Sequence, residues 1–273
     1  MTDVAGRTAF ITGGANGIGL GIARALAGAG AKIALVDLDE SALDAAKDEL
    51  SKTAEVFAAK LDVRDRDAYA EVAREVELAL GCVSILVNNA GVAGGASLDK
   101  LNYELWDWGV DINFNGVFNG VRNFVPGMMQ REEGGHVVNT ASSAGLVANA
   151  SGVLYHATKF GVVGMSEAMQ IELAPHGIGV TVLCPGPVAT GIVERTRASQ
   201  PKISREMSRA QLRAAFEKHD AMKQFLEQGA SPDDVGQMVV EAVKTNQLHL
   251  HTCASVKDLV VTRHKAIMDA MPA

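Results

Sequence analysis

Residues 8–30 read TAFITGGANGIGLGIARALAGAG, in which a short apolar run passes through a glycine-rich turn into a stretch with helical spacing. The run at 8–12 is continuous and rich in strand formers, which is typical of a strand buried on both faces. Gly13 allows a sharp turn, Gly17 lets the backbone approach a bound group, and Gly19 permits close helix packing. The stretch predicts a strand–turn–helix unit that opens a parallel sheet.

The same alternation of apolar run and helical stretch recurs along the chain. Further runs occupy 32–37, 55–62, 84–89, 136–142, 179–185 and, as an edge-like strand, 247–252. Strands that alternate with helices predict an α/β fold: a doubly wound parallel sheet of Rossmann type, with about seven strands and helices on both faces. No repeat or linker marks a second domain, so residues 1–273 are expected to form one domain.

Composition restricts the class of protein. The 273 residues are 48% hydrophobic and carry a net charge of -7, which disfavours a general binder of nucleic acid or anionic membranes. The N-terminus does not resemble a signal peptide, and no apolar run approaches the ~20 residues that a membrane span needs. Cys82, Cys184 and Cys253 form no CxxC pair. We therefore expect a cytoplasmic metabolic protein.

The turn at 12–19 (TGGANGIG) has the features of a dinucleotide site, because it aims the amides of a helix N-terminus at a pyrophosphate. Asp37 ends the second strand, close to the ~20 residues at which an acid contacts the adenosine ribose. A carboxylate there repels a 2'-phosphate and Leu38 supplies no cation, so NAD is favoured over NADP; an N-cap or turn aspartate is the alternative interpretation. The candidates in the turn are Gly13, Asn16, Gly17, Ile18 and Gly19.

A second group of reactive side chains lies in 142–159, SSAGLVANASGVLYHATK. Tyr155 and Lys159 have i, i+4 spacing, so in a helix they share one face. A free phenol titrates near pH ~10, and a neighbouring cation brings its phenolate within reach. The pair predicts a proton-transfer site, although each residue taken singly suits a helix surface. Ser142 adds a hydroxyl to this site, and the neighbouring Ser143 is the alternative candidate for the same role.

Six motifs follow one another in a fixed order: TGGANGIG (12–19), NNAG (88–91), DIN (111–113), Ser142, YxxxK (155–159) and CPGPVAT (184–190). With this order and spacing the chain resembles the short-chain dehydrogenase/reductase family from about Arg7 to Thr190. The resemblance implies a nicotinamide cofactor and hydride transfer between an alcohol and a carbonyl compound.

The resemblance also implies a role for each reactive residue. Tyr155 would be the general acid/base, and Lys159 would hold the nicotinamide ribose and lower the pKa of the tyrosine. Ser142 would hydrogen-bond the substrate oxygen, and Asn113 would hold a water that links the lysine to solvent. Besides Tyr155 and Lys159, the implied cofactor contacts outside the turn are Asp37, Leu38, Asp62, Val63, Asn89, Ala90, Gly91, Pro185, Gly186, Val188 and Thr190.

Three loops are expected to line the substrate pocket: 90–97, 144–151 and 187–193. They contain no Arg or Lys and offer small or apolar groups, namely Ala93, Gly94, Leu146, Val147, Val188, Ile192 and Val193. Residues 191–228 lengthen the connection after the sixth strand and are interpreted as a substrate lid, with a helical hairpin or an oligomer contact as alternatives. Its cations Arg195, Arg197, Lys202, Arg205, Arg209 and Arg213 are expected to solvate a helix rather than to meet a remote anion.

These features favour an NAD-dependent enzyme that interconverts a hydrophobic secondary alcohol, whether aromatic, alicyclic or steroid-like, and its ketone. The chain is also loosely similar to bacterial dehydrogenases that oxidise benzylic alcohols of lignin-derived dimers. An NADPH-linked 3-ketoacyl or polyketide ketoreductase and a non-catalytic nucleotide-binding regulator remain alternatives.

Three histidines are expected to take no part in catalysis or metal binding. His156 turns away from Tyr155 on a helix and is expected to pack or face solvent. His249 and His251 alternate on one strand without further ligands, so no metal site is expected. The family resemblance implies a homodimer or homotetramer formed through helices around 102–130 and 153–174 and the C-terminal strand and helix.

Overall fold

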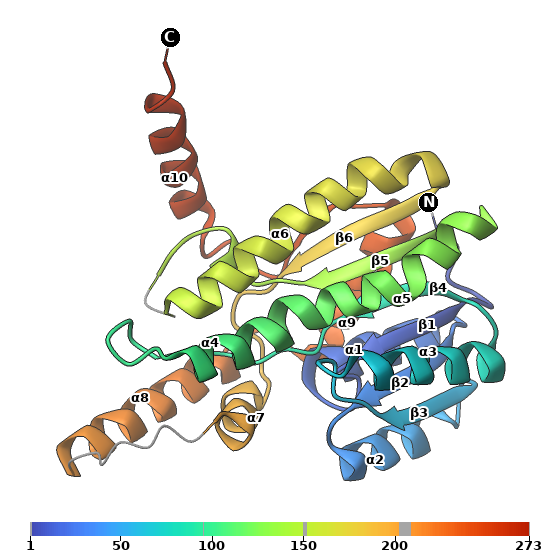
Figure 1. The fold of residues 1–273 in the computed structure, drawn as a ribbon, viewed down its shortest axis with the longest axis horizontal. Coiled ribbons are helices and arrows are strands. Elements are labelled where there is room, and N and C mark those ends of the chain that lie inside the picture. The colour runs from blue at the N-terminus through green and yellow to red at the C-terminus, as the bar shows by residue number, and fades with distance from the viewer. Residues whose placement is uncertain (1, 95, 150–151, 202–208, 273) are drawn as a thin grey trace.

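The computed structural model describes residues 2–94, 96–149, 152–201 and 209–272. Seven strands form one parallel sheet in the order β3-β2-β1-β4-β5-β6-β7 (Figure 1). The strands are β1 (Thr8–Thr12), β2 (Lys32–Asp37), β3 (Val56–Lys60), β4 (Val83–Asn88), β5 (Gly135–Thr140), β6 (Ile178–Cys184) and β7 (His249–His251). The predicted doubly wound, seven-stranded sheet is confirmed. Because the strand order reverses between β1 and β4, ligands are expected beyond the carboxyl ends of these strands.

Helices cover both faces of the sheet (Figure 1). They are α1 (Gly17–Gly28), α2 (Glu40–Leu50), α3 (Arg66–Leu80), α4 (Tyr103–Val110), α5 (Gly116–Arg131), α6 (Val153–Leu173), α7 (Ile192–Ser199), α8 (Arg209–Glu227), α9 (Pro232–Thr245) and α10 (Lys257–Asp269). Side chains alternate along β1: Ile11 packs with α1, α2 and α9, whereas Phe10 packs with α3, α5 and α6. Both sets of side chains are buried, which explains why the strand sequences are apolar without alternation.

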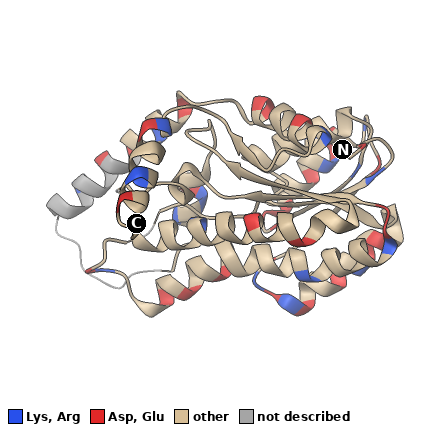
Figure 2. Ribbon diagram, turned by 90° about the horizontal axis from the view of Figure 1, so that it is seen from above, with Lys and Arg blue, Asp and Glu red and all other residues tan. Residues whose placement is uncertain are grey.

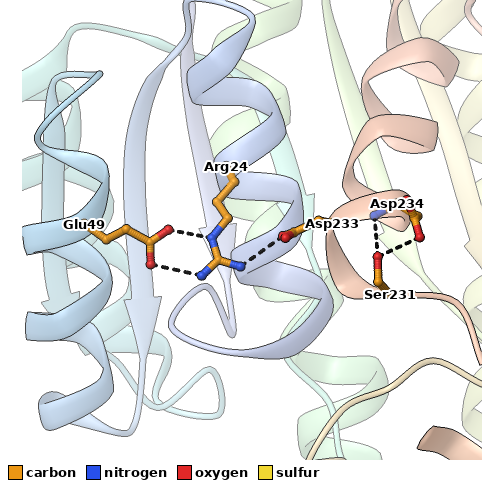
Figure 3. A network of polar contacts seen from close by, with 5 residues as sticks. All are labelled: Arg24, Glu49, Ser231, Asp233 and Asp234. Atoms are coloured by element: carbon orange, nitrogen blue, oxygen red, sulfur yellow. Dashed lines mark hydrogen bonds and ion pairs between the residues drawn. The ribbon is translucent and has the colours of Figure 1, made fainter.

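Polar contacts fix α1, the helix that follows the glycine turn (Figure 3). Arg24 on α1 donates to Glu49 of α2 at 2.9 Å and to Asp233 of α9 at 3.0 Å. The Ser231 hydroxyl caps α9 by accepting from the amide of Asp234 at 3.1 Å. Each exposed ion pair contributes only about 0.2–1 kcal/mol, so their main effect is to orient α1 between its neighbours.

Two helical segments extend from the body of the molecule. The connection after β6 forms α7 and α8, and α8 runs away from the sheet (Figure 1). Three of the lid cations named from the sequence, Lys202, Arg205 and Arg209, have no described side chain. Helix α10 stands apart at the C-terminus, and all of its residues are exposed or half-buried.

The outer faces of the helices carry mixed charge. Acidic and basic residues lie interspersed along these faces, and the sheet between them is largely uncharged (Figure 2). Within the described ranges, no helix combines the length and the apolar character that crossing a bilayer requires.

Candidate active site

Hydrogen bonds join the carboxyl ends of β1 and β4. Thr12 accepts through its hydroxyl from the amides of Asn89 at 2.9 Å and Ala90 at 3.0 Å. The side-chain amide of Asn89 returns hydrogen bonds to the carbonyls of Thr12 at 3.0 Å and Gly13 at 3.2 Å. Asn89 and Ala90, which the sequence assigned to the cofactor, therefore fix the start of the glycine turn.

The turn itself has a backbone that only glycine adopts easily. Gly13 and Gly17 have φ of 62° and 50°, and a Cβ added at Gly19 would overlap the carbonyl of Gly13. At the N-cap of α1, the side chain of Asn16 makes no hydrogen bond to the helix within the described structure. Asn16 thus leaves the first amides of α1, including that of Ile18, without a capping side chain in the described ranges, and the turn fits a pyrophosphate.

Asp37 lies between the end of β2 and the glycine turn. Its carboxylate accepts from the amide of Leu38 at 2.8 Å and from that of Ala15 at 3.2 Å. This places an acid beside the glycine turn, and its predicted contact with the adenosine ribose stays a prediction. The Leu38 side chain is 49% exposed beside it and brings no positive charge.

Asp62 and Val63 follow β3, next to the end of β2. Arg64 binds the Asp62 carboxylate at 2.6 Å. Burial raises the pKa of Asp62, but its hydrogen bonds with Arg64 outweigh burial and leave the pKa below the usual value. Val63 is buried, and its carbonyl accepts from the side chain of Asn119 at 2.8 Å. A charged pair and an apolar side chain therefore border the expected adenine position.

The three reactive groups of 142–159 meet between β5 and α6. The Ser142 and Tyr155 hydroxyls are hydrogen-bonded, and the Lys159 ammonium lies 5.8 Å from the centroid of the Tyr155 ring. Lys159 is 4% exposed and donates to the carbonyl of Thr140 at 2.9 Å. The Ser143 amide donates to the carbonyl of Pro185 at 2.9 Å, and the hydroxyl that lowers the pKa of Tyr155 is that of Ser142, so the geometry favours Ser142.

Burial shifts the titration of both ionisable groups in this cluster. It lowers the pKa of Lys159 to about 8, since the ammonium loses its hydration. It raises the pKa of Tyr155, and the hydrogen bond with Ser142 partly offsets this rise. Without further positive charge the phenol stays neutral and can donate a proton, whereas action as a base requires a nearby cation that favours the phenolate.

Asn113 lies in a π-helical segment, η1 (Asp111–Asn115), between α4 and α5. Its side chain accepts from the amide of Val92 at 2.8 Å and donates to the carbonyl of Val92 at 3.0 Å. A Cβ at Gly91 would lie 3.1 Å from the Asn113 amide oxygen and 3.6 Å from the Lys159 nitrogen. Asn113 is therefore beside Lys159, but its side chain braces the loop after β4, so a water near the lysine would depend on other atoms of this residue.

The segment after β6 approaches the glycine turn from the other side. Its backbone is held by hydrogen bonds from Gly186 to the Thr252 hydroxyl at 3.0 Å and from Ala189 to the carbonyl of Ala230 at 3.0 Å. The Thr190 methyl lies 3.1 Å from the position of a Cβ at Gly17. Thr190 is thus close to the turn, and Pro185, Gly186 and Val188 precede it in the same segment, whose contacts to the nicotinamide half stay a prediction.

Helix α7 adds a residue that sequence reasoning assigned to solvent. One guanidinium nitrogen of Arg195 lies 3.3 Å from the position of a Cβ at Gly17, and the other lies 3.1 Å from that at Gly191. In the next position, the Thr196 hydroxyl accepts from the amide of Ala93 at 2.8 Å. The sequence position of Arg195 could have indicated this placement, because a helix that starts just after Thr190 begins beside the glycine turn.

A separate cavity of about 820 Å³ lies between α6, β7 and α10. Leu146, expected in the substrate pocket, lines this cavity, and Val147 is buried. The His249 and His251 rings stack with centroids 6.3 Å apart. Among the described residues, no group of three or more His, Cys, Asp or Glu is placed to hold a metal. The described lining does not include Asn113, Ser142, Tyr155 or Lys159.

Comparison with known proteins gives consistent matches. A family model described as short chain dehydrogenase matches residues 7–201. A C alpha-dehydrogenase of Sphingobium sp. is 32% identical over 99% of this chain and 88% of its own, and a D-beta-hydroxybutyrate dehydrogenase of Cupriavidus necator is 35% identical over 86% and 90%. The crystal structure of a short chain dehydrogenase/reductase from Burkholderia phymatum in complex with NAD superposes with a TM-score of 0.91 at 32% identity, covering 100% of this chain and 98% of that one.

Proposed function

Because the chain belongs to the short-chain dehydrogenase family, whose members act on alcohols and ketones, we propose that it is an NAD-dependent dehydrogenase that oxidises a hydrophobic secondary alcohol to its ketone. One observation carries the proposal: the hydrogen-bonded Ser142 and Tyr155, with Lys159 beside them, lie next to a glycine turn that fits a dinucleotide. An intact set of these groups disfavours a non-catalytic regulator.

The proposed chemistry divides the two hydrogens of the carbinol. Tyr155, as phenolate, would take the hydroxyl proton, and an oxidised nicotinamide held by the glycine turn would supply the acceptor for the hydride of the carbinol carbon, so that a ketone is left. The Ser142 hydroxyl donates to the substrate oxygen and stabilises the charge that develops there. The Lys159 charge, 5.8 Å from the centroid of the phenol ring, would favour the phenolate, and Asn113 holds the loop after β4, which passes Lys159.

The residues around the turn support NAD as the cofactor. The Asp37 carboxylate would accept from the ribose hydroxyls and would repel the 2'-phosphate of NADP. Arg195 would place a cation against the pyrophosphate at the N-terminus of α1, since its guanidinium already lies over Gly17. The similarity to a protein solved with NAD is consistent with this choice. An NADPH-linked ketoreductase is the second candidate, and Asp37 speaks against it.

An apolar substrate suits the walls near the reactive groups. The loop after β4 carries Ala93 and Gly94, and Ile192 and Val193 open α7. Thr196 ties these two segments together, so the lid would cover the substrate with small and aliphatic groups. Dehydrogenation at a carbon that bears an aromatic or aliphatic substituent, as in a relative named for Cα dehydrogenation, fits such walls.

The proposed assembly is a homodimer or homotetramer. Helix α10 exposes Leu259, Val261, Ile267 and Met268, and Ile171 of α6 is 79% exposed. Apolar side chains on a projecting helix are costly in water and are typical of a surface that a second copy covers. Light scattering that finds a dimer or tetramer at micromolar concentration supports this part, and a monomer contradicts it.

The proposed location is the cytoplasm. Cys82, Cys184 and Cys253 are unpaired within the described structure, and Cys184 is buried beneath the reactive cluster. Free thiols suit a reducing compartment. Partial disulfide formation in protein isolated from cells would contradict this placement.

The decisive experiment for the function is an assay of purified protein with 1-phenylethanol, 1-indanol and cyclohexanol, each with NAD and with NADP. Nicotinamide absorbance reports turnover directly. We expect reduction of NAD with at least one of these alcohols and much slower reduction of NADP. Tight binding of NADH without turnover across a broader alcohol panel would instead favour a regulator.

A further inference from the structure

His156 follows Tyr155 on α6, and both nitrogens of its ring contact the loop that joins β5 to α6. The Nδ1 atom lies 2.7 Å from the carbonyl oxygen of Ala144. The Nε2 atom lies 3.0 Å from the amide nitrogen of Asn149 and 3.1 Å from its carbonyl oxygen. One imidazole therefore holds the beginning and the end of the loop that carries Ser142.

The partners determine the tautomer of the ring. A carbonyl oxygen can only accept, so the proton must be on Nδ1 for the contact with Ala144. In the neutral ring Nε2 then accepts from the Asn149 amide. The carbonyl and side-chain oxygens of Asn149, each 3.1 Å from Nε2, can only accept, so they would pair with Nε2 when the ring carries a second proton. In either form the ring joins Ala144 to Asn149.

Ala144 links His156 to the reactive hydroxyls. Its carbonyl is held by His156, and its amide donates to the Ser142 oxygen at 3.1 Å. That oxygen is also hydrogen-bonded with Tyr155. Because the Ala144 amide occupies a lone pair of Ser142, the hydroxyl proton is left to donate toward an oxygen in the site. The position of Ala144 thus decides where the Ser142 proton points.

We propose that His156 is a positioning residue for Ser142: by holding Ala144, it aims the serine hydroxyl at the oxygen of the reacting alcohol. The proposal rests on the proposed function and adds a residue to it. His156 does not touch the substrate and takes no proton from it. The two ring contacts of His156 play different parts. The Nδ1 contact holds Ala144 directly, whereas the Nε2 contact holds Asn149, farther along the loop.

Matched variants separate the two contacts. The Asn side chain places an amide donor near the position of Nδ1, the Gln side chain places one near Nε2, and Ala removes both. We expect His156→Ala and His156→Gln to lower kcat at least tenfold, and His156→Asn to stay within about threefold of the parent enzyme. The dissociation constant of NADH, measured by fluorescence titration, should change less than twofold in all three.

A double-mutant cycle tests whether His156 acts through Ser142. In the Ser142→Ala background, adding His156→Ala should cause less than a twofold further loss of the residual rate, because the group that His156 aims is already gone. A full additional loss, or equal losses for the Asn and Gln variants, would overturn the proposal. If His156→Ala does not fold, as judged by circular dichroism, the Asn and Gln pair still decides.

The same data separate this proposal from the function on which it rests. If Ser142→Ala and Tyr155→Phe leave turnover of the most reactive alcohol unchanged, the proposed function fails. If those two variants lose activity while His156→Ala and His156→Gln keep the parent kcat, the proposed function stands and only the positioning role is refuted.

Discussion

Replacing Lys159 by Met should make the protein more stable and inactive. The ammonium is 4% exposed, and burial lowers its pKa from 10.5 to about 8. That interval corresponds to about 3 kcal/mol of unfavourable free energy for the charged form. Met has a similar length without the charge and gives up the hydrogen bond to Thr140, which contributes about 1 kcal/mol. We therefore expect Lys159→Met to raise the free energy of unfolding by about 2 kcal/mol at neutral pH.

The stability gained by Lys159→Met should depend on pH, and the lowered pKa of Lys159 sets the direction of that dependence. Between about 8 and 10.5 the unfolded chain holds a proton on Lys159 that the folded chain has released. The parent protein therefore gains stability from this group as pH rises through that window, and the variant does not. The advantage of Lys159→Met should be complete below about pH 8 and should shrink as pH approaches about 10.5.

Urea denaturation at equal protomer concentration measures this difference near pH ~7 and pH ~10. Lys47→Met is the matched control, because Lys47 is exposed on α2 and its replacement should change stability little at either pH. A Lys159→Met protein that is less stable than the parent at neutral pH, or an advantage that is equal at both pH values, would refute the assignment of a desolvation cost to Lys159.

Three further predictions concern the cofactor. Asp37→Ala should reduce the preference for NAD over NADP roughly tenfold or more in kcat/KM, and an unchanged preference would show that the ribose contact is misplaced. Arg195→Ala should weaken NADH binding roughly tenfold and reduce its salt dependence in fluorescence titrations, whereas Arg213→Ala on α8 should do neither. Gly19→Ala should weaken NADH binding more than tenfold, because its Cβ would displace the Gly13 carbonyl; unaltered binding would contradict the proposed turn.

The fold was accessible from the sequence because its signals are local and mutually consistent. Continuous apolar runs predicted the strands, and each observed strand falls within two residues of its run, including the short β7 at His249–His251. Parallel strands that are buried on both faces are apolar throughout, so each can be recognised in the sequence before its neighbours in the sheet are known. The i, i+4 spacing of Tyr155 and Lys159 depends only on neighbours in the chain.

Contacts that depend on how a loop folds back onto the rest of the molecule could not be predicted from the sequence. Helix periodicity indicated only that His156 points away from Tyr155, not that the loop at 142–149 folds back onto its ring. Arg195 resembled the other lid cations, because its approach to Gly17 requires the path of the chain after β6. The engagement of Asn113 with Val92 follows from a π-helical turn that no residue pattern announced.

The central claim is that Tyr155 transfers the alcohol proton while the glycine turn holds NAD. Its most direct test is Tyr155→Phe, which removes one oxygen and keeps the ring. We predict loss of at least a thousandfold in kcat for oxidation of the most reactive alcohol, with an NADH dissociation constant within about threefold of the parent value. Retained turnover by Tyr155→Phe would contradict the account.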